Sequence, residues 1–401
     1  MMKKPVIRFK GYTETWEQRK LGDIADIVGG GTPSTSKEEY WDGEIDWYAP
    51  AEIADQIYVD SSTRKITEEG FENSSAKMLP VGTVLFTSRA GIGKMAILCK
   101  ESCTNQGFQS IVPHENELDS YFIFSRSEEL KKYGETVGAG STFVEVSGKQ
   151  MAAMELMMPQ TIEEQRQIGE YFKIIDHIIT LHQRKYEQLK MIKKIMLKKL
   201  FPENGVFIPE IRFWGHTETW EQRKFSEQYK KVSEKNDLSF GSDKIISVAN
   251  MYFREDASNS DESYMKTYNI MRLGDIAFEG NKSKNYAHGR FVENTIGDGL
   301  VSHVFDVFRP IAKYDLLFWK YLINNEGIMG RIMSRCTKAS TMMTNLVADD
   351  FLKESILVPS LEEQHQIGKY LDEIDKFITL HQRKCEQLQK VKRYMLQNMF
   401  V

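Results

Sequence analysis

The sequence predicts an α+β protein with two pseudo-twofold-related globular domains, separated by two long helices that pair as an antiparallel coiled coil. Three observations support this fold class. A long helical segment occurs twice, the phrase TETWEQRK occurs twice, and the two stretches that these repeats enclose do not resemble each other. The repeated segments form a duplicated frame, whereas the two stretches that they enclose differ. This pattern is expected of a protein that presents two different surfaces at a set distance.

The two copies of the helical segment are Glu163–Phe201 and Glu362–Phe400, with about 23 of 39 positions identical. TETWEQRK stands at 13–20 and again at 217–224. The repeats therefore divide the 401 residues into an N-terminal segment repeated later, a first insert, a first helical repeat, a second insert and a second helical repeat: 1–20 (repeated at 206–224), 21–158, 159–205, 206–358 and 359–401. Each insert with its helix is long enough to bury a core of its own.

The composition is that of an ordinary globular protein, with 41% hydrophobic and 27% charged residues and a net charge of −4. No apolar run approaches the ~18 residues of a membrane span, and the N-terminal residues lack the apolar region of an export signal. Four irregularly spaced cysteines fit a reducing cytoplasm. Cys99 and Cys103 would be half of a metal site, but no second pair with zinc spacing follows, so we expect no metal.

Both inserts are predicted to mix short strands with helices. In the first insert the strand-like runs precede an amphipathic helix: Val81–Thr87, Met95–Cys99 and Gln109–Pro113, then Tyr121–Tyr133. The second insert has the same order: Lys244–Val248, Asp275–Glu279 and Val301–Arg309, then Leu316–Asn325. Neither insert alternates strands and helices as a doubly wound nucleotide-binding fold does.

The repeated helices carry an apolar seam with alternating steps of three and four residues, which is a heptad pattern. Its apolar members are Phe172, Ile175, Ile179, Leu189 and Met196 in the first helix and Leu371, Ile374, Ile378, Leu388 and Met395 in the second. Neither helix can bury its seam alone, so we expect the two helices to pack on each other. His182 and His381 occupy matching seam positions, where each either fixes the register or lies at a partly exposed edge.

The helix ends are marked by sequence signals. Thr161 and Ser360 follow prolines and are expected N-caps, and Pro202 ends the first helix. A 39-residue helix is ~58 Å long, on the scale of one to two turns of B-DNA. Basic residues dominate 184–199 and 383–393; these runs are either solvated helix faces or stripes that face phosphates or a partner subunit.

Catalytic signatures are not convincing. Ser88–Met95 resembles a phosphate-binding loop, but Ser88 replaces its first glycine and Met95 its Ser/Thr. Gly138-Ala139-Gly140 lacks the third glycine of a dinucleotide fingerprint, and we find no Asn-Pro-Pro-aromatic motif or nuclease carboxylate cluster. We therefore expect a chain that is not an enzyme.

Polar, glycine-rich turns provide candidate DNA contacts. Arginine recognises guanine, glutamine and asparagine recognise adenine, and hydroxyls hold phosphates. The candidates in the first insert are Ser88, Arg89, Lys94, Asn105, Gln106, Gln109, Ser141 and Thr142, and those in the second are Asn281, Lys282, Lys284, Asn285, Tyr286, His288, Arg290 and Lys338. For any single residue, a turn residue bonded to its own backbone is the alternative.

These residues resemble the specificity subunit of type I restriction-modification systems. The resemblance rests first on the two long helices that begin near P-x-x-E-E-Q, each after a variable domain. In the first insert it rests on Gly31-Thr32-Pro33-Ser34, Tyr40-Trp41-Asp42-Gly43, Val84-Leu85-Phe86, Asn105-Gln106-Gly107-Phe108 and Gly140-Ser141-Thr142-Phe143. The second insert is more divergent.

The resemblance implies two target recognition domains, each of which reads one half of a split, asymmetric site in double-stranded DNA. It also implies that the helices set the spacer and dock two methyltransferase subunits, which restriction subunits join. S-adenosylmethionine, ATP and Mg²⁺ would belong to those partners, and this chain would bind no cofactor. Two alternatives are a coiled-coil scaffold for two domains that bind ligands other than DNA, and the recognition part of a fused methyltransferase-nuclease.

Overall fold

The computed structural model describes residues 4–54, 56–89, 91–139, 145–203, 205–254, 262–339 and 343–401. By its internal contacts the chain forms two units, residues 1–182 with 383–401 and residues 183–382. Each unit contains one insert and half of each long helix, because both helices run from one unit into the other. This division cuts across the linear one that the repeats suggest. No described helix is long and apolar enough to cross a membrane.

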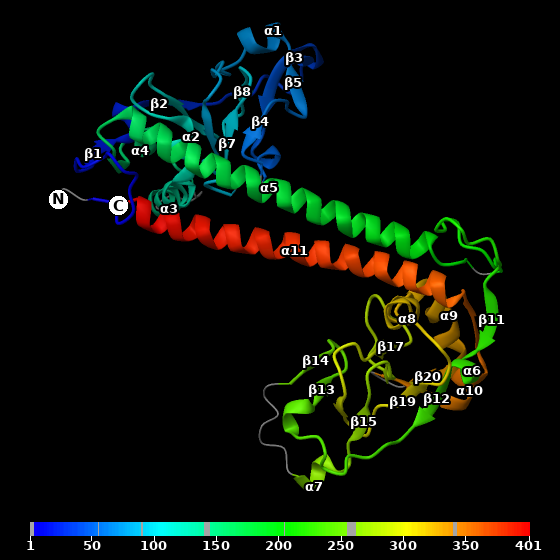
Figure 1. The fold of residues 1–401 in the computed structure, drawn as a ribbon. Helices are drawn as coiled ribbons and strands as arrows, with labels where there is room; N and C mark the ends of the chain where they lie inside the picture. The colour runs from blue at the N-terminus through cyan, green and yellow to red at the C-terminus, as the bar shows by residue number, and fades with distance from the viewer. Residues whose placement is uncertain are drawn as a thin grey trace. The chain divides into compact units, whose positions relative to one another are not determined.

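The first unit is built on a five-stranded sheet that is antiparallel except for its last pair. In spatial order its strands are β2 (Ala25–Gly29), β9 (Gln109–Pro113), β6 (Val84–Phe86), β7 (Met95–Leu98) and β4 (Tyr58–Val59). A smaller sheet beside it contains β5 (Arg64–Ile66), β3 (Trp41–Tyr48) and β8 (Cys103–Thr104), with α1 (Glu68–Glu72) next to it. Figure 1 shows α1, β3, β5 and β8 grouped together. The predicted strands at 95–99 and 109–113 are confirmed, whereas the predicted run Val81–Thr87 is a strand only at Val84–Phe86.

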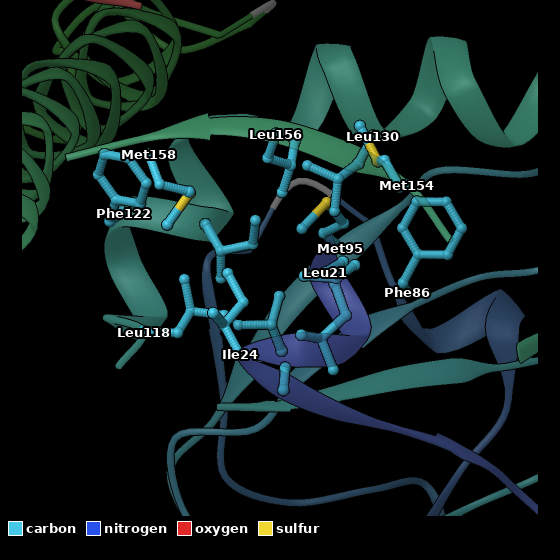
Figure 2. Packing of buried hydrophobic residues seen from close by; sticks show 14 of the residues in the cluster. Leu21, Ile24, Phe86, Met95, Leu118, Phe122, Leu130, Met154, Leu156 and Met158 are labelled. Atoms are coloured by element: carbon cyan, nitrogen blue, oxygen red, sulfur yellow. The ribbon is translucent and has the colours of Figure 1, made fainter. Parts of the chain in front are cut away.

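The helices of the first insert cover the large sheet and close its core. They are α2 (Ser120–Ser125), α3 (Ser127–Gly138) and α4 (Gly148–Ala152). One continuous helix at Tyr121–Tyr133 was expected, and the structure breaks it at Arg126, whose guanidinium donates to the Met157 carbonyl at 2.7 Å. Figure 2 shows the core, in which Leu21, Phe86 and Leu130 pack together.

Apart from the strand pair that closes the insert, the described residues of the second unit form a four-stranded antiparallel sheet and three small two-stranded ribbons. The sheet order is β12 (Tyr229–Val232), β19 (Val307–Pro310), β16 (Ile276–Glu279) and β17 (Arg290–Glu293). The ribbons pair β13 (Ile246–Ser247) with β14 (Tyr252–Phe253), β15 (Asn269–Met271) with β18 (Gly299–Val301), and β20 (Thr337–Ala339) with β21 (Thr344–Leu346). The helices are α6 (Phe225–Gln228), α7 (Glu262–Met265), α8 (Leu316–Ile323), α9 (Glu326–Cys336) and α10 (Ala348–Lys353).

Two predicted strands of the second insert are wrong in extent. The expected run Val301–Arg309 is split between β18 and β19, because the chain turns between them with the Phe305 N–H donating to the Ser302 carbonyl at 3.0 Å. The expected run Lys244–Val248 holds only the two residues of β13, after a short 3-10 turn at Ser242–Lys244. The strand at 275–279 and the helix at 316–325 are confirmed to within two residues.

The repeated TETWEQRK phrase forms the strand that closes each insert. In the first copy β1 (Glu17–Lys20) pairs with β10 (Glu155–Met158), and in the second β11 (Glu221–Lys224) pairs with β22 (Ser355–Val358). Trp16 and Trp220, at equivalent places in the phrase, are both fully buried. The two copies of this sequence thus have the same structural role: each pairs with the last strand of its insert, directly before the long helix.

The long helices are α5 (Ile162–Lys199) and α11 (Leu361–Met399), close to the predicted bounds. The expected N-caps are confirmed: the Thr161 hydroxyl accepts from the Glu164 N–H and the Ser360 hydroxyl from the Glu363 N–H, each at 3.3 Å. All ten apolar residues of the predicted seam are buried or half-buried.

The helices pair antiparallel within each unit. In the first unit Lys392 lies 2.6 Å from Asp176, and Met395 and Met399 pack against the cluster that contains Phe172. In the second unit the matching ion pair is Lys193 with Asp375, also at 2.6 Å. As the residue number rises on one helix, that of its neighbour falls, as Figure 1 also shows.

Each domain is tied to its helix by the same two contacts. The Tyr121 hydroxyl donates to Asp176 at 2.9 Å, and the Tyr321 hydroxyl donates to Asp375 at 2.7 Å. A buried ion pair, Arg8 with Glu164 or Arg212 with Glu363, fastens the segment before the closing strand to the first turn of the helix at 2.7 Å. Asp176 and Asp375, which lie beside the apolar seam and are called the seam aspartates, therefore each join three elements: both helices and the domain.

We expect Asp176→Asn to lower the free energy of unfolding by about 1–3 kcal/mol, because the amide cannot neutralise Lys392 in the half-buried seam. Glu187→Gln is the control, since Glu187 pairs with Lys190 on the exposed surface of the helix and contributes little. Urea unfolding followed by circular dichroism measures both variants. Equal stability of the two would contradict a stabilising role for the seam ion pair.

Glu293 is an acid inside the core of the second domain. Its side chain is 2% exposed, and neither carboxylate oxygen has a hydrogen-bond partner among the described residues. Burial raises the pKa of Glu293 well above its usual value of 4.5, and the nearby positive charge of Lys320 only partly opposes that rise. The folded domain therefore holds this carboxyl in its neutral form to a higher pH than the unfolded chain does.

The folded state binds the Glu293 proton more tightly than the unfolded chain does. The stabilisation that this proton contributes is therefore complete below about pH 4.5 and is lost as the pH rises through the raised pKa of Glu293. Glu293→Gln keeps the shape without a titrating group. We expect it to raise the stability of the second domain at pH 8 and to flatten the alkaline decline, as measured by thermal unfolding across pH. Exposed Glu362→Gln is the control, and identical pH profiles for the two variants would refute this assignment.

Candidate nucleic-acid interface

In the described part of the first domain, the loop after β2, the loop between β6 and β7 and the loop before β9 meet at one end of the large sheet. The loop after β2 lies on the one before β9: the Gly31 N–H donates to the Thr104 carbonyl at 2.9 Å, and the Thr32 hydroxyl donates to the Gln106 side chain. Gly30 permits this approach, since a Cβ there would lie 2.1 Å from the Asn105 carbonyl oxygen.

The loop between β6 and β7 joins the same cluster. Thr87 organises it, because its backbone N–H donates to the Lys94 carbonyl at 3.0 Å and its hydroxyl donates to the Gly91 carbonyl at 2.7 Å. The Ser88 N–H donates to the Gly107 carbonyl at 2.8 Å, and the Val146 N–H donates to the Ser88 carbonyl at 3.0 Å. Stretches that are far apart in the sequence thus form one surface.

The predicted contact residues differ in how they are placed on this surface. Lys94 and Gln106 are exposed, whereas Arg89, Asn105 and Gln109 are half-buried. Ser88 departs from the prediction: its side chain is fully buried, so its hydroxyl does not face a ligand. Asn105 also has the turn role that was the alternative, because its side-chain oxygen accepts from the Gly107 N–H at 2.8 Å. Ser141 and Thr142 lie outside the described residues.

In the second domain the candidate surface is the loop between β16 and β17, residues 280–289, held by the β20–β21 hairpin. The Thr344 N–H donates to the Gly280 carbonyl at 2.8 Å, and its hydroxyl donates to the His288 carbonyl at 2.9 Å. Lys338 is on β20 of the same hairpin and is exposed. The structure therefore brings together both stretches that the sequence suggested for this domain.

Side chains of this second surface are mostly exposed. Asn281, Lys282, Lys284 and Asn285 are exposed, and Tyr286 and His288 are half-buried. Arg290 has a structural role instead: its guanidinium pairs with Glu279 at 2.8 Å across the two strands and stacks 5.2 Å from the Tyr286 ring centroid. Its charge is thus neutralised within the domain.

Each unit also exposes an apolar stripe on the helix pair, which sequence reasoning missed. In the first unit it consists of Ile174, Ile178 and Leu181 of α5 with Val391 and Tyr394 of α11, and in the second of Ile192 and Ile195 of α5 with Phe377 and Leu380 of α11. In an antiparallel pair, heptad positions that flank the same edge of the seam face one side. The signal was present in the sequence, because these residues repeat with the same steps of three and four as the seam.

The two candidate surfaces carry amides, cations and hydroxyls on loops, which are residue types suited to contacts with nucleic acid. Within the described residues, no group of three or more His, Cys, Asp or Glu side chains could hold a metal ion.

Sequence comparison identifies relatives with a common description. The chain is 35% identical over 186 residues to the MjaIX type I restriction enzyme specificity subunit of Methanocaldococcus jannaschii, covering 46% of this chain and 42% of that protein. It is 31% identical over 189 residues to the EcoR124I/EcoR124II specificity subunit of Escherichia coli, covering 43% and 46%. The chain thus spans less than half the length of these two relatives. The MjaVIII specificity subunit of Methanocaldococcus jannaschii aligns over 96% of this chain and 91% of its own length at 23% identity.

Among solved structures, the type I restriction-modification S subunit from M. genitalium matches with a TM-score of 0.62 and 14% identity, over 100% of this chain and 99% of that one. At this identity the match shows a common fold. The model of the type I restriction modification DNA specificity domain matches twice, over residues 13–191 and 218–390. These two ranges are the two insert-and-helix repeats, and the chain belongs to the type I restriction-modification DNA specificity family.

Proposed function

We propose that the chain is the DNA-specificity subunit of a type I restriction-modification complex and that each domain recognises one half of a bipartite, asymmetric site in double-stranded DNA. One observation carries the proposal: two different loop surfaces are attached to two equivalent frames, each made of a closing strand pair and the long helices. Equivalent frames can bind two copies of the same partner, whereas different loop surfaces can recognise two different half-sites. The paired helices then set the spacer between the half-sites.

The exposed stripes of the helix pair supply the docking sites for two methyltransferase subunits. Each stripe is apolar and solvent-facing, and burying such side chains against a partner helix is favourable by roughly 1.5–3 kcal/mol each. The stripes occur once per unit at equivalent positions, so two copies of one subunit fit them. Restriction subunits join through the methyltransferase subunits.

In this assembly the chain recognises the DNA sequence, and its partner subunits carry out the catalysis. S-adenosylmethionine, ATP and Mg²⁺ bind the partner subunits, and the complex works in the cytoplasm, where foreign DNA meets it. Support for a non-catalytic role comes from the loop surfaces themselves, which carry amides and cations suited to DNA contacts.

Coexpression with its neighbouring methyltransferase subunit should methylate adenines in a split motif, mapped across the host genome by single-molecule sequencing. Replacing residues 21–158 with the corresponding insert of another family member should change one half of that motif and leave the other half intact. A motif that changes in both halves, or in neither, would contradict independent reading by the two domains.

Leu181→Glu and Leu380→Glu should each remove one of the two methyltransferase docking sites, because a carboxylate cannot be buried in an apolar contact without a large cost. We expect the mass of the complex, measured by native mass spectrometry, to fall from two methyltransferase subunits per chain to one in each single variant and to none in the double variant. Lys173→Glu introduces the same carboxylate on the exposed surface of α5, outside the stripe and outside the basic run 184–199, and serves as the control. Two bound subunits in the double variant would exclude the stripe as the docking surface.

A further inference from the structure

Arg64 of the first domain is a cation held flat by aromatic rings. Its guanidinium carbon lies 3.7 Å from the centroid of the Trp41 ring and 5.8 Å from that of Trp47. Arg64 is directly opposite Trp47 in the β3–β5 pair, and the two indoles meet edge to face at 5.1 Å. Because a stacked guanidinium keeps its N–H edge free, this side chain is fixed in place and still able to donate hydrogen bonds.

A bulge in β3 makes this stack possible. Trp41 and Ile45 both lie opposite Ile66, so residues 42–44 form an excursion that brings Trp41 close to Trp47. Asp42 starts the excursion with a φ of 59°, in the left-handed region. The bulge costs backbone strain, and its effect is to stack one arginine on two indoles. A strained backbone that is kept for this arrangement indicates that the stacked arginine has a function.

The same two indoles hold the loop of the candidate interface. The Trp47 indole N–H donates to the Gly31 carbonyl at 2.8 Å, and that of Trp41 donates to the Ser34 carbonyl at 3.2 Å. This is the loop whose Thr32 hydroxyl reaches Gln106. Arg64 is therefore anchored to the loop surface that we assign to DNA, and the exposed hydroxyls of Ser34 and Ser36 lie on that loop.

Arg64 is also electrostatically available. Arg8, Arg19 and Arg126 of the same domain are each paired with a glutamate, at 2.7, 3.1 and 2.8 Å. In the described part of the chain no carboxylate pairs with Arg64, and its side chain is exposed. Its sheet neighbour Lys65 points the other way and pairs with the buried Asp46 at 3.6 Å.

We propose that Arg64 binds a backbone phosphate of the DNA at the edge of the first half-site and so positions the DNA on the domain. The hydroxyl-bearing loop 32–36 lies beside it. A phosphate rather than a base fits because the Arg64 guanidinium has hydroxyl groups on the adjacent loop, and a guanidinium with hydroxyls is a set that holds phosphate oxygens. The exposed amide of Gln106, which the Thr32 hydroxyl of this loop contacts, is left to contact a base. This proposal rests on the DNA-specificity function above.

The test is DNA binding by the complex of the full chain with its methyltransferase subunits, measured as a function of salt. Two duplexes are compared: one with the mapped methylation motif, and one in which the first half-site is scrambled. Arg64→Ala should weaken binding to both by the same factor and make the slope of log K against log salt shallower by about one, the value for one phosphate contact. Lys65→Met, which removes the same charge from the opposite face, should leave the slope unchanged.

Arg64→Lys separates charge from stacking. It should retain the wild-type slope, because an ammonium still neutralises one phosphate, and bind both duplexes several-fold more weakly, because it cannot stack or bind in bidentate fashion. An unchanged slope in Arg64→Ala would overturn the proposal, and so would a loss confined to the motif duplex, which would indicate a base contact. Absence of motif-specific binding by the wild-type complex would instead count against the DNA-specificity function.

Discussion

The seam ion pairs, Lys392 with Asp176 and Lys193 with Asp375, are the contacts on which the arrangement of each unit depends. A purely apolar seam would permit the helices to slide by a heptad at little cost, whereas a half-buried lysine must meet its carboxylate. The same aspartates accept a hydrogen bond from Tyr121 or Tyr321 of the adjacent domain. In each unit, one aspartate thus fixes both the register of the two helices and the position of the domain on them.

On this foundation the chain separates constant from variable parts. The Leu21 N–H donates to the Met154 carbonyl at 2.8 Å, and the Phe225 N–H donates to the Glu354 carbonyl at 2.9 Å, so each insert starts and ends at an equivalent joint. Inside these joints the two sheets differ in strand number and in order. A domain that is closed by its own short strand pair can change its loops without disturbing the helices, as the proposed recognition of two different half-sites requires.

The sequence predicted the duplicated parts well and the inserts less well. Helix bounds, N-caps and seam follow from local signals that occur twice, and a repeated signal is hard to misinterpret. The burial of Ser88, the pairing of Arg290 with Glu279 and the break at Arg126 depend on contacts with distant segments, which no local pattern encodes. The Arg8 to Glu164 pair spans 156 positions. Its only sequence signal was the second copy of Ile-Arg-Phe at 211–213, which extends the repeated phrase toward the N-terminus.

The most direct test of the duplicated frame is to exchange the two inserts within one chain, placing residues 225–354 where 21–154 stand and the reverse, so that all four closing strands and both helices are retained. The methylation motif of the exchanged chain, coexpressed with its methyltransferase subunit, is then compared with that of the original chain. Equivalent frames predict the same two half-sites in reversed order with the same spacer length. A soluble complex that methylates an unreversed motif, or the same half-sites at a different spacing, would contradict the equivalence of the two frames.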